Sequence, residues 1–176
     1  AGPGGENDMG EVFAIMRRAS IAEGLDVSMA EVDRAIEAAR EAGKILTNKI
    51  DFIQNIQFKD TRKVDLVTEA DTASEAKILE IIRRKYPKHQ ILAEESGTHA
   101  SDSEWKWIID PLDGTSNFLH GIPHFAISIA VQDPKPDGSG WGDIFAGLVY
   151  NPITDESFWA ERGKGAWLGN RRLRVS

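Results

Sequence analysis

Residues 107–118, WIIDPLDGTSNF, pass from apolar to polar within a single residue, which sets strict limits on how this segment folds. Its first part, Trp107 to Ile109, is an apolar run with the length of a short buried strand. Pro111 fixes its own φ and biases the residue before it toward an extended backbone. We therefore predict that a strand ends with the Asp110 carboxylate at its carboxyl end, and that the following turn returns Asp113 to the same side.

Two carboxylates that converge in this way predict a cation site. They repel each other unless a cation lies between them, and oxygen ligands without Cys or His suit Mg²⁺ or Mn²⁺. Gly114 to Asn117 can open a helix, and backbone N–H groups at a helix start beside a glycine bind anions. The segment thus predicts adjacent metal and phosphate sites. The alternative is a polar turn between two strands, because Asp, Pro and Gly are common turn residues.

A second acidic pair follows another short apolar strand. Gln90 to Ala93 reads as that strand, and Glu94 and Glu95 come directly after it. Because side chains alternate along a strand, only one of the two glutamates can face a given site. If the two strands are neighbours, Glu94 joins Asp110 and Asp113 at one edge of the sheet. Otherwise the pair is ordinary surface charge.

Two amphipathic helices are predicted before the strands. Residues 28–31 (SMAE) form a capping-box pattern followed by apolar residues at helical spacing, which predicts a helix over about 29–48. Residues 57–67 read as extended. Asp71 then lies at a helix cap, with Thr72 and Glu75 as a second capping box and a second helix running to Tyr86.

The remaining chain reads as hairpin-connected strands. Short strands are predicted over four segments, residues 125–131, 144–150, 156–161 and 165–168, and residues 98–104 read as a polar loop. Two helices followed by such a run predict an α+β fold, with two long helices packed on a mainly antiparallel sheet. We expect residues 1–27 to be a tag or a disordered or weakly helical extension, and residues 28–176 to form the domain.

Composition excludes several classes of function. Lys and Arg number 21 against 28 Asp and Glu, and the resulting charge of −7 disfavours direct binding of nucleic acid. The absence of Cys excludes disulfides and thiol chemistry and favours a reducing cytoplasm. No apolar run has membrane-spanning length, so we expect a cytoplasmic protein that does not associate with membranes.

Three motifs, residues 65–71 (DLVTEAD), 91–96 (ILAEES) and 107–118, resemble the inositol monophosphatase family. This family lies within the Mg²⁺-dependent, Li⁺-sensitive phosphatase superfamily that includes fructose-1,6-bisphosphatase. The resemblance runs in consistent order from about Val32 to Ser176 and implies the N-terminal domain of that fold. Residues 120–130 (HGIPHFAISIA) resemble bacterial members, and the Gly-Thr-Ser of residues 114–116 resembles the inositol-phosphate branch, since the nucleotide branch typically has Gly-Thr-Lys.

The resemblance implies metal ligands at four positions. Glu94, Asp110 and the backbone carbonyl of Leu112 would bind the first Mg²⁺, for which Mn²⁺ is a possible substitute. Asp110 and Asp113 would bind a second ion.

The resemblance also implies the residues that handle phosphate and water. Asp113 and the N–H groups of Gly114 and Thr115 would bind the phosphate. Thr115, oriented by Asp71, would activate water together with Glu94. Glu95 and Asp65 would be supporting neighbours.

The implied activity is Mg²⁺-dependent hydrolysis of inositol 1-phosphate by a homodimer. Three alternatives keep the chemistry and change the substrate, to a sugar phosphate, histidinol phosphate or a nucleotide. Another is a regulatory member that binds a partner in RNA transcription. Family members continue into a further domain with a WDxAAG motif, and no Trp-Asp pair occurs in residues 1–176. We therefore expect this chain by itself to bind Mg²⁺ weakly and to hydrolyse little.

Overall fold

The computed structural model describes residues 30–55, 62–101, 103 and 105–174 of the chain. The predicted extension over residues 1–27 and the capping residue Ser28 lie outside these ranges. Among the described residues, no helix is long and apolar enough to cross a membrane.

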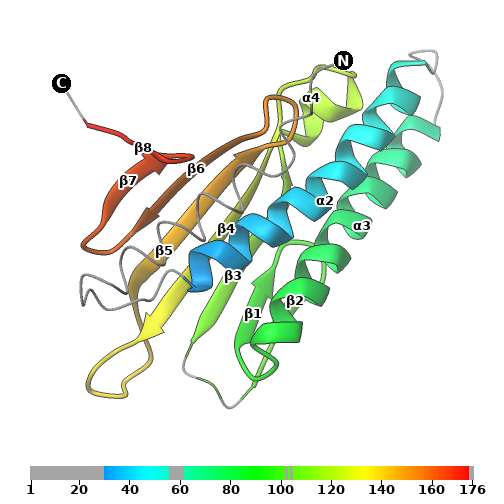
Figure 1. The fold of residues 1–176 in the computed structure, drawn as a ribbon. Helices are drawn as coiled ribbons and strands as arrows, with labels where there is room; N and C mark the ends of the chain where they lie inside the picture. Colours follow the sequence, from blue (N-terminus) through cyan, green and yellow to red (C-terminus); the bar gives the residue numbers. More distant parts are fainter. Residues whose placement is uncertain (1–29, 56–61, 102, 104, 175–176) are drawn as a thin grey trace.

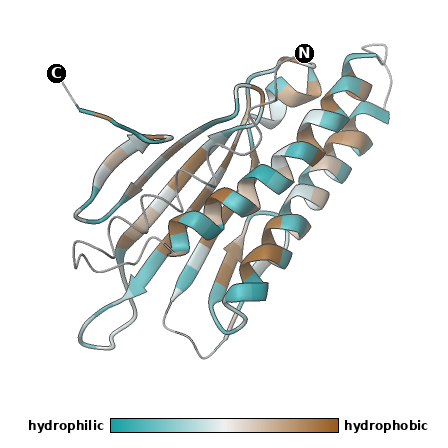
Figure 2. Cartoon of the chain, viewed as in Figure 1, coloured by the Kyte–Doolittle hydropathy of each residue, from teal (hydrophilic) through white to brown (hydrophobic). Residues whose placement is uncertain are grey.

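Two long helices lie side by side on one face of the sheet (Figure 1). Helix α2 (Ala30–Gln54) confirms the first predicted helix and extends it at its carboxyl end. Its apolar residues recur at helical spacing, and the buried ones include Ile36, Leu46 and Ile50. Figure 2 shows the hydrophobic residues of the helices interspersed with hydrophilic ones, as expected for helices with one face in a core.

The second helix begins earlier than the sequence indicates. Helix α3 spans Arg62–Lys85, so the prediction of an extended segment through residue 67 is wrong for residues 62–67. The prediction that Asp71 is a cap and that Thr72 and Glu75 form a capping box is also wrong, because all three lie within the helix. Asp71 and Glu75 are buried there. The pattern misled because a polar residue on the buried face of a helix looks locally like a capping residue.

The strands form one sheet in the order β2-β1-β3-β4-β5-β6-β7-β8. Their bounds are β1 Gln90–Ala93, β2 Gly97–His99, β3 Lys106–Asp113, β4 Ala126–Pro134, β5 Trp141–Asn151, β6 Glu156–Glu161, β7 Gly165–Leu168 and β8 Arg171–Arg172. In the described chain β1 and β3 pair in parallel, and the other neighbours pair in antiparallel. The predicted α+β class and mainly antiparallel sheet are confirmed, while β2 and β8 were not predicted.

The core lies between the helices and one face of the sheet. Along β4, the residues Ile127, Ile129 and Val131 are buried and the residues between them are half-buried. Helix α2 approaches β5 so closely that a Cβ on Gly43 would lie 2.8 Å from the Tyr150 ring. Glycine at this position therefore allows the helix to lie against the sheet.

The opposite face of the sheet is less covered. Leu92, Val149 and Phe158 lie on it and are 40%, 45% and 40% exposed. Val149 and Phe158 are cross-strand neighbours on β5 and β6. The sheet thus has one buried apolar face and one that retains exposed apolar side chains.

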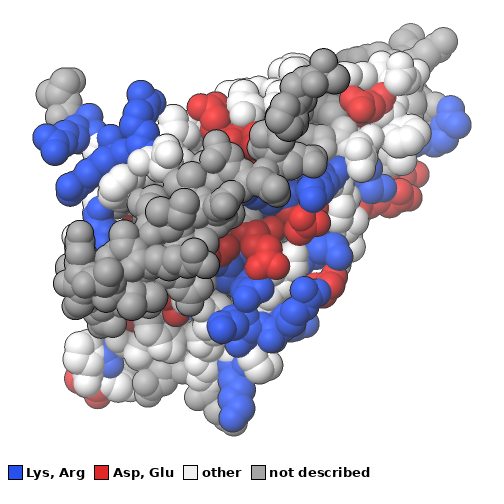
Figure 3. Space-filling model, viewed as in Figure 1, with Lys and Arg blue, Asp and Glu red and all other residues white. Residues whose placement is uncertain are grey.

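Charged residues on the helices are mixed in sign. Figure 3 shows acidic and basic side chains next to one another over α2 and α3. Several form ion pairs one helical turn apart, including Arg34 with Glu37 at 2.7 Å and Lys77 with Glu80 at 2.7 Å. Such exposed pairs contribute little to stability individually.

Candidate functional site

The parallel pairing of β1 with β3 brings the predicted acidic residues together. Ala93 is in register with Ile109, and the Glu94 N–H donates to the Ile109 carbonyl at 3.1 Å, which extends the ladder by one residue. Glu94 and Asp110 therefore lie side by side. The prediction that the second strand ends at Asp110 is wrong, because β3 continues past Pro111 to Asp113, with an irregular register against β4. The condition set by the sequence, that the two strands be neighbours, is met.

The Glu94 and Asp110 carboxyl groups interact directly. A hydrogen bond with Asp110 is the largest influence that raises the pKa of Glu94 to about 7, followed by burial and by repulsion from Asp110, Glu95 and Asp113. Such a shift is typical of two carboxyl groups that share one proton. Asp113 belongs to the same electrostatic cluster through its repulsion of Glu94.

Asp71 faces this cluster from helix α3. It is only 7% exposed, and burial raises its pKa to about 7, together with repulsion from Glu95, Glu94 and Asp110. Its Oδ1 atom is buried without a hydrogen-bond partner in the structure. A buried carboxylate oxygen of this kind is available to a group that binds at the cluster.

The loop between Asp110 and Thr115 is held by its own hydrogen bonds. The Leu112 N–H donates to Asp110 Oδ1 at 3.2 Å, and the Thr115 hydroxyl donates to the Leu112 carbonyl at 3.0 Å. The resemblance implied that Asp71 orients Thr115, whereas in this structure the Thr115 hydroxyl has the Leu112 carbonyl as its partner. Both Thr115 and Leu112 nevertheless belong to one turn beside Asp110.

Gly114 lies where only a glycine fits without strain. It caps the short helix α4 (Thr115–Leu119) with φ 86°, in the left-handed region. A Cβ at this position would lie 3.2 Å from the His124 carbonyl oxygen and 3.3 Å from the Phe125 Cα. The close approach fixes the backbone from Gly114 to Thr115 against the start of β4.

The donor set fits a hard divalent cation. Neighbouring carboxylates raise the pKa of Glu94 and Asp71, and a cation that neutralises the cluster would stabilise it. Oxygen donors of this kind suit Mg²⁺ or Mn²⁺. In the described part of the chain, no three His, Cys, Asp or Glu side chains form a ready-made metal cage. The residues thus agree with a metal site in chemistry and proximity.

Two functional neighbours were missed by the sequence analysis. Ser74 and Glu75 on α3 are 0% and 3% exposed, and each hydrogen-bonds to one of the acidic segments. The available signal was their spacing. Ser74 and Glu75 lie three and four residues after Asp71, on the helix face that also carries the apolar residues Val67 and Ile78. Glu75 was instead interpreted as part of a capping box.

The two supporting residues predicted from the resemblance are placed differently. Glu95 is exposed and interacts with Asp71 through its side chain, so it borders the cluster. Asp65 lies exposed in the first turn of α3, where its negative charge interacts favourably with the helix dipole. Its supporting role stays a prediction.

A serine–histidine pair next to the cluster is not arranged as a nucleophile and base. Ser96 Oγ lies 2.6 Å from His99 Nε2, and the Arg83 guanidinium donates to His99 Nδ1 at 2.8 Å. Because Nδ1 accepts a hydrogen bond, the ring proton is on Nε2 and is donated to Ser96. The histidine therefore cannot take the serine proton, and the geometry does not favour covalent catalysis by Ser96.

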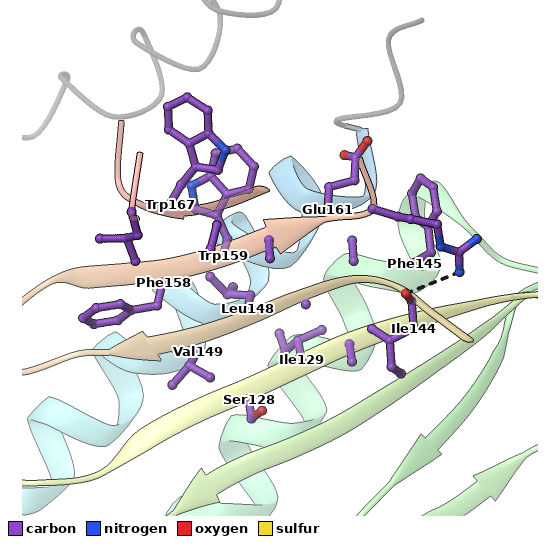
Figure 4. Close-up of a pocket in the computed structure, with 17 residues that line it drawn as sticks. Ser128, Ile129, Ile144, Phe145, Leu148, Val149, Phe158, Trp159, Glu161 and Trp167 are labelled. Carbon is purple, nitrogen blue, oxygen red and sulfur yellow. Dashed lines mark hydrogen bonds between the residues drawn. The ribbon is translucent and has the colours of Figure 1, made fainter. Parts of the chain in front are cut away.

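A cavity of about 500 Å³ lies along β4 to β7, and its lining includes none of the acidic residues of the cluster. Its lining is mostly apolar and includes Val149, Phe158 and Trp167 (Figure 4). The titratable residues of this lining are Glu161 and Arg162, and the Arg162 guanidinium donates to the Ile144 carbonyl at 3.4 Å. The cavity lacks the converging oxygen donors of the cluster.

Comparison with known proteins agrees with the motifs. The sequence profile of the inositol monophosphatase family matches residues 28–176. An inositol-1-monophosphatase of Caulobacter vibrioides is 44% identical over 143 residues, which cover 80% of this chain and 54% of that protein. The Nus factor SuhB of Haemophilus influenzae is 46% identical over 142 residues, which cover 80% of this chain and 51% of that protein. The chain therefore spans about half the length of these relatives.

A solved structure shows the same fold. The crystal structure of the extragenic suppressor protein suhB from Bartonella henselae matches with a TM-score of 0.69 and 41% identity. The match covers 84% of this chain and 54% of the other.

Proposed function

The chain belongs to the inositol monophosphatase family, and we propose that it supplies the metal- and phosphate-binding half of a Mg²⁺-dependent phosphomonoesterase that hydrolyses inositol 1-phosphate. Within this proposal Mn²⁺ can replace Mg²⁺, the working protein is a cytoplasmic homodimer, and Li⁺ inhibits it. Residues 28–176 are its N-terminal domain.

One observation carries the proposal. Glu94 follows β1, Asp110 lies in the adjacent parallel strand β3, and the two share a hydrogen bond that raises the pKa of Glu94 to about 7. Two acids held in this way, with Asp113 close enough to repel Glu94, are a costly arrangement in the absence of a cation. Their position beside the Gly114–Thr115 backbone supports a site for metal and phosphate together.

The residues have distinct proposed roles. Glu94, Asp110, Asp113 and the Leu112 carbonyl would hold the metal, which when bound lowers the pKa of water and neutralises phosphoryl charge. The N–H groups of Gly114 and Thr115 would hold the phosphate. Glu94 would accept the proton of the attacking water. Thr115, oriented by Asp71 with its unpartnered Oδ1, would help to activate that water.

This assignment is tested by phosphate release from the complete natural protein, including any residues beyond Ser176. We expect release from inositol 1-phosphate with Mg²⁺, inhibition by Li⁺, and at least a hundredfold loss in Asp110→Asn. Sugar phosphates, histidinol phosphate and nucleotides belong in the same panel. A preference for any of these would change the substrate while keeping the mechanism, and release unaffected by Asp110→Asn would refute the site.

A regulatory role is the second candidate, because several relatives are named Nus factor SuhB. In this proposal the protein binds a partner in RNA transcription, and its acidic charge disfavours direct contact with nucleic acid. A chromosomal Asp110→Asn variant separates the two candidates. A cellular phenotype that survives loss of phosphate release would support the regulatory role.

A further inference from the structure

Helix α3 contacts both acidic segments of the proposed metal site through two consecutive residues, Ser74 and Glu75. Neither residue belongs to the metal or phosphate ligands proposed above. Both are almost completely buried, at 0% and 3% exposed. Burying a polar group costs free energy unless it is hydrogen-bonded, so each of the two needs a partner. Their partners are backbone groups of the two segments that carry the acids.

Glu75 holds the turn that carries Glu94. Its Oε2 accepts the Glu95 N–H at 2.7 Å and its Oε1 accepts the Ser96 N–H at 2.9 Å. Each carboxylate oxygen thus takes one N–H of two consecutive peptide groups, and such charge-assisted bonds are short and directional. Because the Glu94 N–H is bonded to the Ile109 carbonyl, the backbone of this turn is held by β3 on one side and by α3 on the other.

Ser74 holds the segment that carries Asp110 and Asp113. Its hydroxyl donates to the Pro111 carbonyl at 2.8 Å, at the irregularity where β3 leaves its register with β4. The bond from α3 thus holds the backbone between Asp110 and Asp113, where the pairing with β4 is irregular.

We propose that Ser74 and Glu75 are positioning residues that set the separation of Glu94 from Asp110 and Asp113. The inference rests on the proposed function and adds residues that act through the ligands. With Asp71 one helical turn earlier, they form one stripe of α3 facing the acidic cluster. A rigid helix that bonds to both segments can hold two strand ends at the spacing that a cation requires, as outer-shell partners do in metal sites.

The test is Mn²⁺ binding, measured by electron paramagnetic resonance on the complete natural protein. We expect affinity to fall by about 10- to 100-fold in Glu75→Ala, with Glu75→Gln intermediate because the amide keeps one acceptor oxygen. Ser74→Ala should also lower the affinity for Mn²⁺. In Glu75→Gln, amide hydrogen exchange should accelerate at Glu95 and Ser96.

Two controls separate positioning from folding. Glu80→Gln makes the same change on an exposed residue of α3 that forms ion pairs with Lys77 and Arg84, and should leave Mn²⁺ affinity within about twofold. Ile82→Val removes a buried methyl group from the same helix, and should lower the melting temperature without changing the affinity.

The possible results are distinguishable. Wild-type protein that binds Mn²⁺ no better than Glu75→Gln or Glu75→Ala overturns the positioning role and leaves the proposed function intact. Equal loss of affinity in Ile82→Val assigns the effect to folding, which also overturns it. Wild-type protein that binds no Mn²⁺ overturns both the proposed function and this inference.

Discussion

At neutral pH Glu94 and Asp71 titrate together, because each carboxyl has its pKa raised to about 7. For Glu94 the hydrogen bond with Asp110 is the largest cause, and for Asp71 it is burial. A free carboxyl in an unfolded chain titrates near pH 4. Between these values the folded protein binds more protons than the unfolded chain, so the acidic cluster opposes folding when it is ionised.

The first prediction concerns pH. A raised acid pKa contributes stability below about pH 4, and this contribution is lost as the pH rises through about 7. Without divalent cations, we therefore expect Glu94 and Asp71 to make the free energy of unfolding fall as the pH rises from about 4 to about 7. Urea denaturation at a series of pH values measures this change. Asp71→Asn should weaken the pH dependence of the free energy of unfolding.

Mg²⁺ provides the matching control. Because a cation favours the ionised carboxylates, we expect Mg²⁺ to raise the melting temperature more at pH 8 than at pH 5. An equal effect at both pH values would contradict a cation site at these carboxyls.

At the scale of elements, two glycines allow backbone arrangements that other residues would oppose. Gly114 positions α4 after β3, and Gly43 lets α2 lie against β5. The two have different physical reasons, namely a left-handed φ at Gly114 and lack of space at Gly43. They therefore predict different consequences of the same substitution.

Gly114→Ala should impair the site. A left-handed φ costs a non-glycine residue about 1–2 kcal/mol, and the Cβ would lie 3.2 Å from the His124 carbonyl oxygen. We expect a loss of stability of that order by urea denaturation and a larger relative loss of phosphate release, because the backbone beside Thr115 must move. Gly138→Ala is the matched control, since Gly138 has φ 70° with no atom within 4 Å of the added Cβ, and it should leave phosphate release unchanged.

Gly43→Ala tests the helix–sheet contact. Alanine gains about 1 kcal/mol of helix propensity, but overpacking a core costs about 1–3 kcal/mol. The Tyr150 ring cannot move easily, because it is buried and its hydroxyl donates to Asp155 at 2.8 Å. Overpacking should therefore exceed the propensity gain, and thermal denaturation should show a lower melting temperature. An increase would mean that the helix shifts freely over β5.

At the scale of the whole molecule, the sheet is covered unequally. Helices α2 and α3 pack on one face, and the other exposes Leu92, Val149 and Phe158. Exposed apolar neighbours on adjacent strands promote association, because contact removes their surface from water.

We expect Phe158→Thr to reduce self-association of residues 1–176 while leaving the melting temperature nearly unchanged, since the side chain is 40% exposed. Sedimentation velocity and thermal denaturation measure the two effects. Trp159→Thr, one residue along the strand and 3% exposed, is the control that should unfold the domain. Similar effects of both substitutions on stability would contradict the assignment of the faces.

The local sequence was sufficient for much of the site. Asp110 and Asp113 follow a strand-length apolar run, and Glu94 follows another. The change in polarity marks the end of β1 at Ala93, whereas β3 continues through its polar residues to Asp113. Alternation along β4 likewise indicated its buried face, since Ile127 and Ile129 lie two residues apart. Such signals are local because strand and turn preferences depend on neighbouring residues.

By itself, the sequence determined the α+β class, the apolar runs that lead into the acids, and the family. The tertiary structure alone decided that β1 and β3 pair in parallel, that α3 begins at Arg62, and that Ser74 and Glu75 bond to both acidic segments. These features depend on residues distant along the chain. A buried polar side chain is hydrogen-bonded only to the partner that folding brings to it. The residues around Glu75 in the sequence therefore do not predict its bonds to the Glu95 and Ser96 N–H groups.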